Sequence, residues 1–200
     1  MTILYTIWYI RGMSTKEDLL GAALELFSTL GIEATSTQAV CDAAGVTKPT
    51  LYHYFGSKRG LIDAVLQRHF QPFIEALKLA TEYHHDLTRN LEMVMKTYFD
   101  FARTNPVFYR LQLAMRGAPA QSETYRAIKP WQEAQTNLVE ALFKAAEADH
   151  GNMRGRSRAY TLSLLGMINA YILEATEAGT MLGDQTVYQA QHQFMHGIFS

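Results

Sequence analysis

The chain has 200 residues, of which 48% are hydrophobic, so it is long enough to bury a sizeable core as one domain or as a small domain joined to a larger one. Only 18% of the residues are charged, below the roughly 25% usual for soluble domains. This favours an oligomer in which part of the surface is covered. The net charge of −1 excludes a globally basic nucleic-acid binder, so a DNA-binding surface would have to be a local basic patch.

The cysteine content and the apolar segments indicate the compartment in which the chain works. Cys41 is the single cysteine and cannot form an internal disulfide, which fits a reducing, cytoplasmic setting. No apolar run approaches the roughly 20 residues of a membrane-spanning helix, so we expect no membrane partner. Residues 3–10 are apolar, but no basic residue precedes them and no cleavage site follows, so a signal peptide is not expected. We treat residues 1–12 as an N-terminal extension of unassigned role, either poorly ordered or packed on a neighbouring chain.

Every long segment has helical periodicity, and none alternates with a period of two. The first expected helix begins at a capping box, Ser14–Glu17, and ends at Gly31. Thr35 or Ser36 caps a short second helix.

The second helix is expected to close at Gly45. Thr47 then caps a third helix, with Pro49 in its first turn, where a missing N–H costs nothing. A fourth helix follows the break at Gly56, and Pro72 is expected to end it. The remaining helices are expected at about residues 72–84, 87–104, 106–116, 122–148, 154–178 and 184–198, with boundaries uncertain by about two to four residues. Pro130 should kink the helix over 122–148.

A local basic window lies around the third helix. No acidic residue occurs between Asp42 and Asp63, whereas Lys48, Lys58 and Arg59 fall inside that interval. Lys48 begins the third helix, and the other two cations begin the fourth. Cations are disfavoured at helix N-termini unless an anion binds there, so the placement indicates phosphate contacts.

The outer side of the third helix is expected to carry Lys48, Pro49, Thr50, Tyr52 and His53. The Tyr52 hydroxyl can donate to a phosphate, while Thr50 and His53 carry groups that can reach base edges. Val40, Cys41, Ala44, Val46, Leu51 and Phe55 are expected to form the small core beneath it. The alternative is that the outer residues are ordinary solvated side chains on a helical hairpin.

The run AAGVTKPTLYHYFGSKRGLIDAVL resembles the signature of the tetracycline-repressor (TetR) family, and the likeness covers roughly residues 14–70. The resemblance implies an all-α protein with a three-helix helix-turn-helix DNA-binding domain over residues 13–70. Residues 71–200 would form a helical ligand-binding and dimerisation domain. Such a protein works as a homodimer on a pseudo-palindromic operator in double-stranded DNA.

The resemblance also implies which residues contact DNA. Thr35 and Ser36 would cap the second helix at a phosphate. Tyr52 and Lys58 would hold the DNA backbone. The residues expected to face the major groove are Lys48, Pro49, Thr50 and His53. The chain departs from the family pattern at Gln38 and Ala39, where an arginine followed by an acid is common, so one phosphate contact is weakened or replaced by an amide contact.

The middle helices of the larger domain are rich in aromatic and methionine side chains. A ligand site there should be apolar with a few polar groups, and methionine suits irregular cavities. The expected effector contacts are Met93, Tyr98, Phe101, Phe108, Tyr109, Trp131, Met167 and Tyr171. The alternative for each is ordinary core packing. Four nearby arginines would suit an anionic ligand, unless they lie on the surface, and they are Arg103, Arg110, Arg116 and Arg126.

The last two helices carry apolar stripes that favour a dimer in which two helices from each subunit form a four-helix bundle. The first stripe comprises Leu162, Leu165, Gly166, Ile168, Asn169 and Ile172. The second comprises Tyr188, Phe194, Met195, Ile198 and Phe199. Such stripes would also suit burial within a monomer.

No catalytic residues, cofactor or metal are expected. His192 and His196 have a spacing that can bind a metal, but no third ligand is evident beside them. The sequence thus predicts a ligand-responsive transcriptional repressor that a small apolar or amphipathic molecule releases from its operator. The alternatives are an activator with the same chemistry, and a small-molecule carrier or enzyme with a vestigial DNA-binding head.

Overall fold

The computed structural model describes the backbone of residues 2–197 and the side chains of residues 15–197. Across this part of the chain no strand occurs, and the expected all-α class is confirmed. The α-helices are α1 (Thr2–Leu30), α2 (Thr37–Ala44), α3 (Lys48–Phe55), α4 (Lys58–Ala80), α5 (Leu87–Thr104), α6 (Pro106–Arg116), α7 (Glu123–Ala146), α8 (Ser157–Ala178) and α9 (Asp184–His196). None of these helices combines the length and apolar character needed to cross a membrane.

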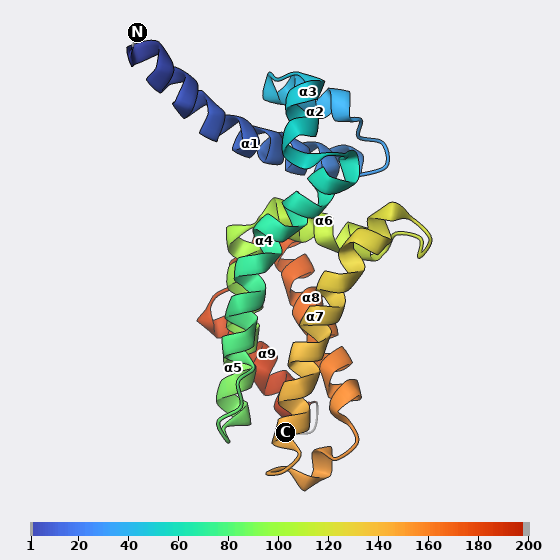
Figure 1. Cartoon of the computed structure of the whole chain (residues 1–200). Helices are drawn as coiled ribbons and strands as arrows, with labels where there is room; N and C mark the ends of the chain where they lie inside the picture. The colour runs from blue at the N-terminus through green and yellow to red at the C-terminus, as the bar shows by residue number, and fades with distance from the viewer. Residues whose placement is uncertain (1, 198–200) are drawn as a thin grey trace. The chain divides into compact units, whose positions relative to one another are not determined.

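The chain divides into two compact units. The first comprises Met1–His69 and Val107–Lys129, and the second comprises Phe70–Pro106 and Pro130–Ser200. In the first unit α2 packs on α1 and on α3 (Figure 1). Its buried apolar side chains recur at helical spacing and include Leu19, Ala23, Phe27, Val40, Cys41, Leu51, Leu61 and Val65.

Two helix starts differ from the sequence-based expectation. Helix α1 begins at Thr2, so the predicted capping box at Ser14 does not start a helix. The Ser14 side chain lies outside the described ones. Helix α4 runs unbroken through Pro72, so the two helices expected there are one. Pro72 lies on an exposed face, where water can bond the backbone carbonyl that loses its N–H partner.

In the second unit α5 packs on α8 and α9 (Figure 1). The Lys96 ammonium lies 3.4 Å from the Asp184 carboxylate at the start of α9. Buried Asn90 donates from Nδ2 to the carbonyls of Ala80 and Glu82, at 2.8 and 2.9 Å, and so closes the α4–α5 corner. Helices α5 to α9 begin and end within about four residues of their expected bounds.

The α3–α4 corner depends on Gly60. A Cβ atom at this position would lie 1.9 Å from the Phe55 carbonyl oxygen, which is a backbone atom that cannot swing away. Ser57 Oγ accepts from the Gly60 N–H at 2.9 Å and caps the first turn of α4. Only glycine therefore allows this close approach of the two helices.

We expect Gly60→Ala to lower the free energy of unfolding by about 1–3 kcal/mol, because the backbone must shift to admit the methyl group. Urea unfolding followed by circular dichroism measures this change. Gly21→Ala is the matched control, since no atom lies within 4 Å of its added Cβ. In mid-helix this change should be neutral or stabilise by up to about 1 kcal/mol. Equal effects of the two substitutions would contradict the close approach.

Candidate nucleic-acid interface

A short turn joins α2 to α3. Ser36 is the N-cap of α2, and its Oγ accepts from the Ala39 N–H at 3.1 Å. Helix α2 ends at Gly45, whose φ of 66° lies in the left-handed region that favours glycine. The Val46 N–H then donates to the Cys41 carbonyl at 3.0 Å. The two helices are thereby held at a tight corner, as a helix-turn-helix requires.

The inner side of this corner is apolar. Val40, Cys41 and Leu51 are essentially inaccessible to solvent, and Phe55 is half-buried. Burial is the largest factor that raises the pKa of the Cys41 thiol, followed by the charge of Asp42. These four side chains therefore belong to the core beneath α3, as expected.

The outer side of α3 is polar. Lys48, Pro49 and His53 are exposed, and Tyr52 is 44% exposed. The Tyr52 hydroxyl lies 3.4 Å from Thr37 Oγ1, which orients the ring across the start of α2.

Thr47 is the N-cap residue of α3, but its hydroxyl makes no cap bond to the backbone. It lies instead 3.0 Å from the hydroxyl of Thr50, which is half-buried. Thr47 therefore holds the expected N-cap position of α3 without a side-chain bond to the helix.

The three cations of the basic window differ in their surroundings. Arg59 Nε lies 2.8 Å from Asp63 Oδ1, one turn along α4, so its charge is offset. Lys58 is half-buried, and its Nζ donates to the Glu33 carbonyl at 3.4 Å, so no carboxylate offsets its charge in that bond. Lys48 is exposed at the start of α3. The basic patch thus rests on Lys48 and Lys58 more than on Arg59.

Thr35, just before α2, does not lie as expected, and Gln38 is bonded within its own helix. Thr35 is only 1% exposed, and its hydroxyl donates to the carbonyls of Leu26 and Gly31. Its side chain is therefore bonded to the backbone at the end of α1, and Ser36 alone caps α2. Gln38 donates from Nε2 to Asp42 Oδ1 at 2.6 Å, so in this structure its amide bonds within α2.

Three of the expected effector residues lie together in the second unit. Trp131 stacks on Phe70, with ring centroids 5.2 Å apart, and Phe101 stacks on Phe73 at 4.3 Å. Tyr98 meets Phe73 edge to face at 4.9 Å. We call Phe70, Phe73, Tyr98, Phe101 and Trp131 the aromatic cluster.

Phe108 and Tyr109 belong to the other unit. The Phe108 ring stacks on His69 at 4.4 Å between centroids, and joins α6 to α4 there. Tyr109 is buried, and that burial raises the pKa of its hydroxyl. These two expected effector residues are therefore buried residues of the first unit.

The last three expected effector residues are half-buried. Tyr171 donates to Gln193 Oε1 at 2.7 Å and so joins α8 to α9. Met93 lies on α5 and Met167 on α8. The aromatic cluster does not include these three.

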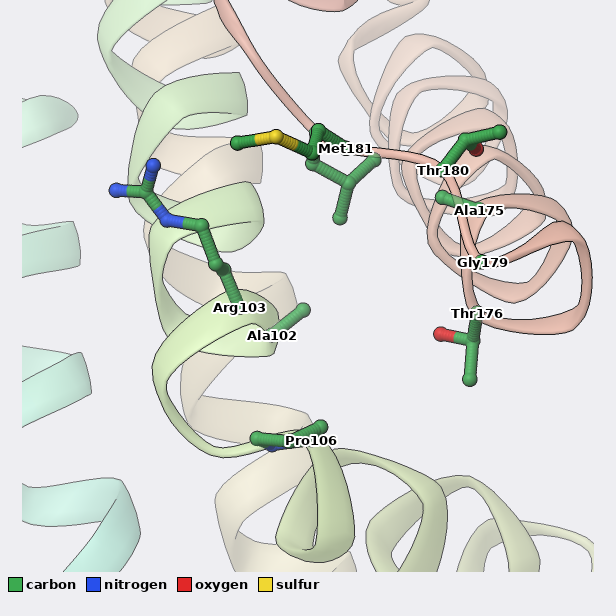
Figure 2. Close-up of a pocket in the computed structure, with 9 residues that line it drawn as sticks. Ala102, Arg103, Pro106, Ala175, Thr176, Gly179, Thr180 and Met181 are labelled. Atoms are coloured by element: carbon green, nitrogen blue, oxygen red, sulfur yellow. The ribbon is translucent and has the colours of Figure 1, made fainter.

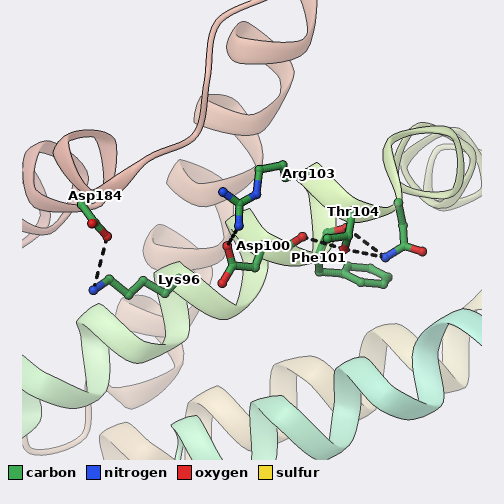
Figure 3. A network of polar contacts seen from close by, with 7 residues as sticks. Lys96, Asp100, Phe101, Arg103, Thr104 and Asp184 are labelled. Carbon is green, nitrogen blue, oxygen red and sulfur yellow. Dashed lines mark hydrogen bonds and ion pairs between the residues drawn. The ribbon is translucent and has the colours of Figure 1, made fainter.

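A cavity of about 360 Å³ opens between the α5–α6 corner and the end of α8 (Figure 2). Its lining comprises Ala102, Arg103, Pro106, Ala175, Thr176, Gly179, Thr180, Met181 and Leu182. None of the eight expected effector residues lines it. Arg103 supplies its cation, but the guanidinium lies 2.7 Å from Asp100, so much of its charge is offset (Figure 3).

Sequence reasoning missed the polar residues on the inner stripe of α7. Gln135 is buried, accepts from the Tyr98 hydroxyl at 3.2 Å and donates to the Trp131 carbonyl at 3.1 Å. The available signal was an amide at a position where the helical period predicts an apolar residue.

The two histidines considered as metal ligands, His192 and His196, are adjacent, with ring centroids 4.7 Å apart. No group of three candidate ligands occurs among the described residues.

Comparisons with known proteins agree with this geometry. Residues 19–65 match the family model described as bacterial regulatory proteins, tetR family. The chain is 31% identical to the HTH-type transcriptional activator FasR of Mycolicibacterium smegmatis over 76% of its own length and 68% of that protein. It is 38% identical to the HTH-type transcriptional repressor KstR2 of Rhodococcus jostii over 26% of each chain.

The fold has a similar solved structure, the transcriptional regulator FadR from Bacillus subtilis in complex with stearoyl-CoA. That chain superimposes with a TM-score of 0.74 at 16% identity, covering 91% of this chain and 98% of that one. The helix-turn-helix corner, the matching family model and the extended identity to FasR lead to one conclusion. The chain belongs to the TetR family and is a DNA-binding transcriptional regulator.

Proposed function

We propose that the chain acts in the cytoplasm as a homodimer that represses transcription and is released from its operator by an amphipathic acyl compound. The observation that carries the DNA-binding part is the two-sided character of α3. Leu51 is buried under this helix, while Tyr52 and His53 are exposed on its outer side. In this proposal residues 13–70 form the DNA-binding domain and residues 71–200 the effector and dimerisation domain.

The proposed DNA contacts follow from exposure and chemistry. Tyr52 and Lys58 hold phosphates at the two ends of the exposed face, and the free N–H groups beside Ser36 add a third phosphate contact. Thr50 and His53 reach base edges in the major groove. The other residues proposed to face the groove are Lys48 and Pro49, which are exposed in the first turn of α3.

The proposed dimer uses exposed apolar side chains of α8 and α9. Leu162 is 51% exposed and Tyr188 is 66% exposed, and Leu173 and Met195 are more than 40% exposed. Large apolar side chains exposed on one helix pair are typical of an interaction surface. Other members of the expected stripes, namely Leu165, Ile168 and Ile172, pack in the chain's own core. Ile198 and Phe199 lie outside the described residues.

The proposed effector site is the aromatic cluster, with an elongated apolar molecule inserted beside it. The cluster offers several ring faces and a few paired polar groups, as ligand sites do. FadR, which shares this fold, has been solved with stearoyl-CoA, and a long acyl chain suits such a lining. Among the other residues predicted from sequence, Tyr171, Met93 and Met167 are half-buried and so remain accessible to an effector.

A contact path for the response runs through α7. Thr124, in its first turn, donates to Glu33 Oε1 at 3.0 Å. The Glu33 carbonyl in turn accepts from Lys58. A movement of α7 on effector binding would therefore be transmitted to a proposed phosphate contact. A coupling of about 1–3 kcal/mol changes DNA affinity about 5- to 150-fold.

Whether such a regulator activates or represses transcription depends on where its operator lies relative to the promoter. FasR is an activator and KstR2 is a repressor, so both signs occur among similar proteins. We propose repression, in which the bound dimer covers the promoter. Mapping the operator against the transcription start tests this, and a site upstream of an uncovered promoter would indicate activation instead.

We expect Lys58→Ala to weaken binding to every DNA sequence and to reduce the slope of log K against log salt by about one unit, because one phosphate contact is lost. Fluorescence anisotropy with a fragment selected from genomic DNA measures both. Arg59→Ala is the matched control, since Arg59 is already paired with Asp63, and it should change the slope less.

His53→Ala should instead relax the preference for particular bases, with a loss of about 1–3 kcal/mol on the selected operator and little change on random DNA. The same anisotropy assay with both DNAs separates these outcomes. An enzyme with a vestigial head would form no salt-sensitive specific complex at all. That result would overturn the proposed function.

Tyr188→Asp is expected to dissociate the dimer, because it places a charge on an apolar surface that the partner must cover. Sedimentation velocity measures the fraction of dimer as a function of concentration. Leu79→Asp is the control, since Leu79 is 67% exposed and belongs to α4, which carries neither of the two stripes. A dimer that survives Tyr188→Asp but not Leu79→Asp would assign the interface to another surface.

A further inference from the structure

One buried polar atom on the inner stripe of α7 has no partner. Gln132 Nε2 is buried and forms no hydrogen bond, and it is the only such side-chain nitrogen or oxygen identified among the described residues. Native proteins seldom leave a buried donor unpaired, because the group has lost water and gained nothing in exchange. We therefore expect such an atom to donate to an acceptor from outside the chain.

The helical register places Gln132 beside the aromatic cluster. It directly follows Trp131, and it lies one turn from Gln135 and two turns from Val139, on the stripe of α7 that faces the core. Gln135 and Val139 are both buried. The unpaired amide thus belongs to the apolar side of the helix and not to its solvated side.

The neighbouring polar groups are already used. Gln135 accepts from the Tyr98 hydroxyl and donates to the Trp131 carbonyl. The Gln132 backbone carbonyl accepts from the Thr136 hydroxyl at 2.8 Å. These groups therefore have their own hydrogen bonds, and the Gln132 side-chain amide is left to bind something else.

We propose that Gln132 is the donor that orients an effector by its neutral carbonyl group, an inference that rests on the effector site proposed above. The site amides, Gln132 and Gln135, carry no charge. The charged residues beside them in sequence, Lys129 and Glu133, are exposed. A buried carboxylate would lack a compensating cation and would be strongly disfavoured, whereas an ester, thioester or amide carbonyl accepts from Nε2 without that cost.

The test compares two probes that differ only in this group, stearoyl-CoA and S-octadecyl-CoA, in which CH2 replaces the thioester carbonyl. We expect the full-length protein to bind stearoyl-CoA about 5- to 30-fold more tightly in a calorimetric titration. In Gln132→Met, which keeps the length of the side chain but removes the donor, this preference should vanish. Without any probe, this variant should melt a few degrees higher, because the unpaired donor is gone.

Gln67→Met is the control, since Gln67 is exposed on α4, and it should keep both the preference and the melting temperature. If Gln132→Met does not fold, Gln132→Leu carries the same test, since it also lacks the donor. Equal binding of the two probes by the wild type, or a preference that survives in the variants, would overturn the inference while leaving the acyl effector in place. Binding of neither probe would overturn the acyl effector and this inference together.

Discussion

The surface proposed to face DNA depends on the burial of one leucine. Helix α3 has eight residues, whereas isolated helices shorter than about 12–15 residues are marginal in water. It persists because Leu51 is completely buried, because Gly45 takes the left-handed conformation that ends α2, and because Gly60 lets the backbones of α3 and α4 approach closely. The same anchoring determines which side of α3 faces outward. Stability and recognition are therefore inseparable at this corner, since any loss of the Leu51 contact also misdirects Tyr52.

In the second unit, polar groups inside an apolar bundle are stabilised by hydrogen bonds to one another and to the backbone. Asn90 closes a corner by bonding two carbonyls, and the Tyr98–Gln135 pair satisfies two groups within the aromatic cluster. Because α7 carries Thr124 at one end and Gln135 further along, the helix that bonds to Glu33 also carries the proposed effector residues. In the proposed function, this continuity is the means by which an effector biases DNA binding.

Local signals in the sequence predicted the positions of most helices, since Gly45, Gly56 and Asn105–Pro106 act through their own backbone geometry. Pro72 was misjudged because its effect depends on whether the freed carbonyl is exposed, which the sequence does not reveal. Thr35 was predicted to be a surface cap because the sequence does not show that its side chain is buried and bonded to α1. The roles of the predicted DNA and effector contacts remain predictions. Gln132 escaped notice because an unpaired buried atom is defined by its three-dimensional neighbours.

The most direct test of the account asks whether the outer side of α3 lies against DNA. Cys41 is inaccessible, so His53→Cys supplies a uniquely reactive thiol to which iron–EDTA can be attached, and the tethered iron cuts whichever DNA lies nearby. On a selected operator, we predict two clusters of cuts separated by one helical turn, about 10–10.5 base pairs, or a multiple of it. A complex that forms yet is not cut from position 53, or is cut equally from Gln185→Cys on α9, would contradict the account.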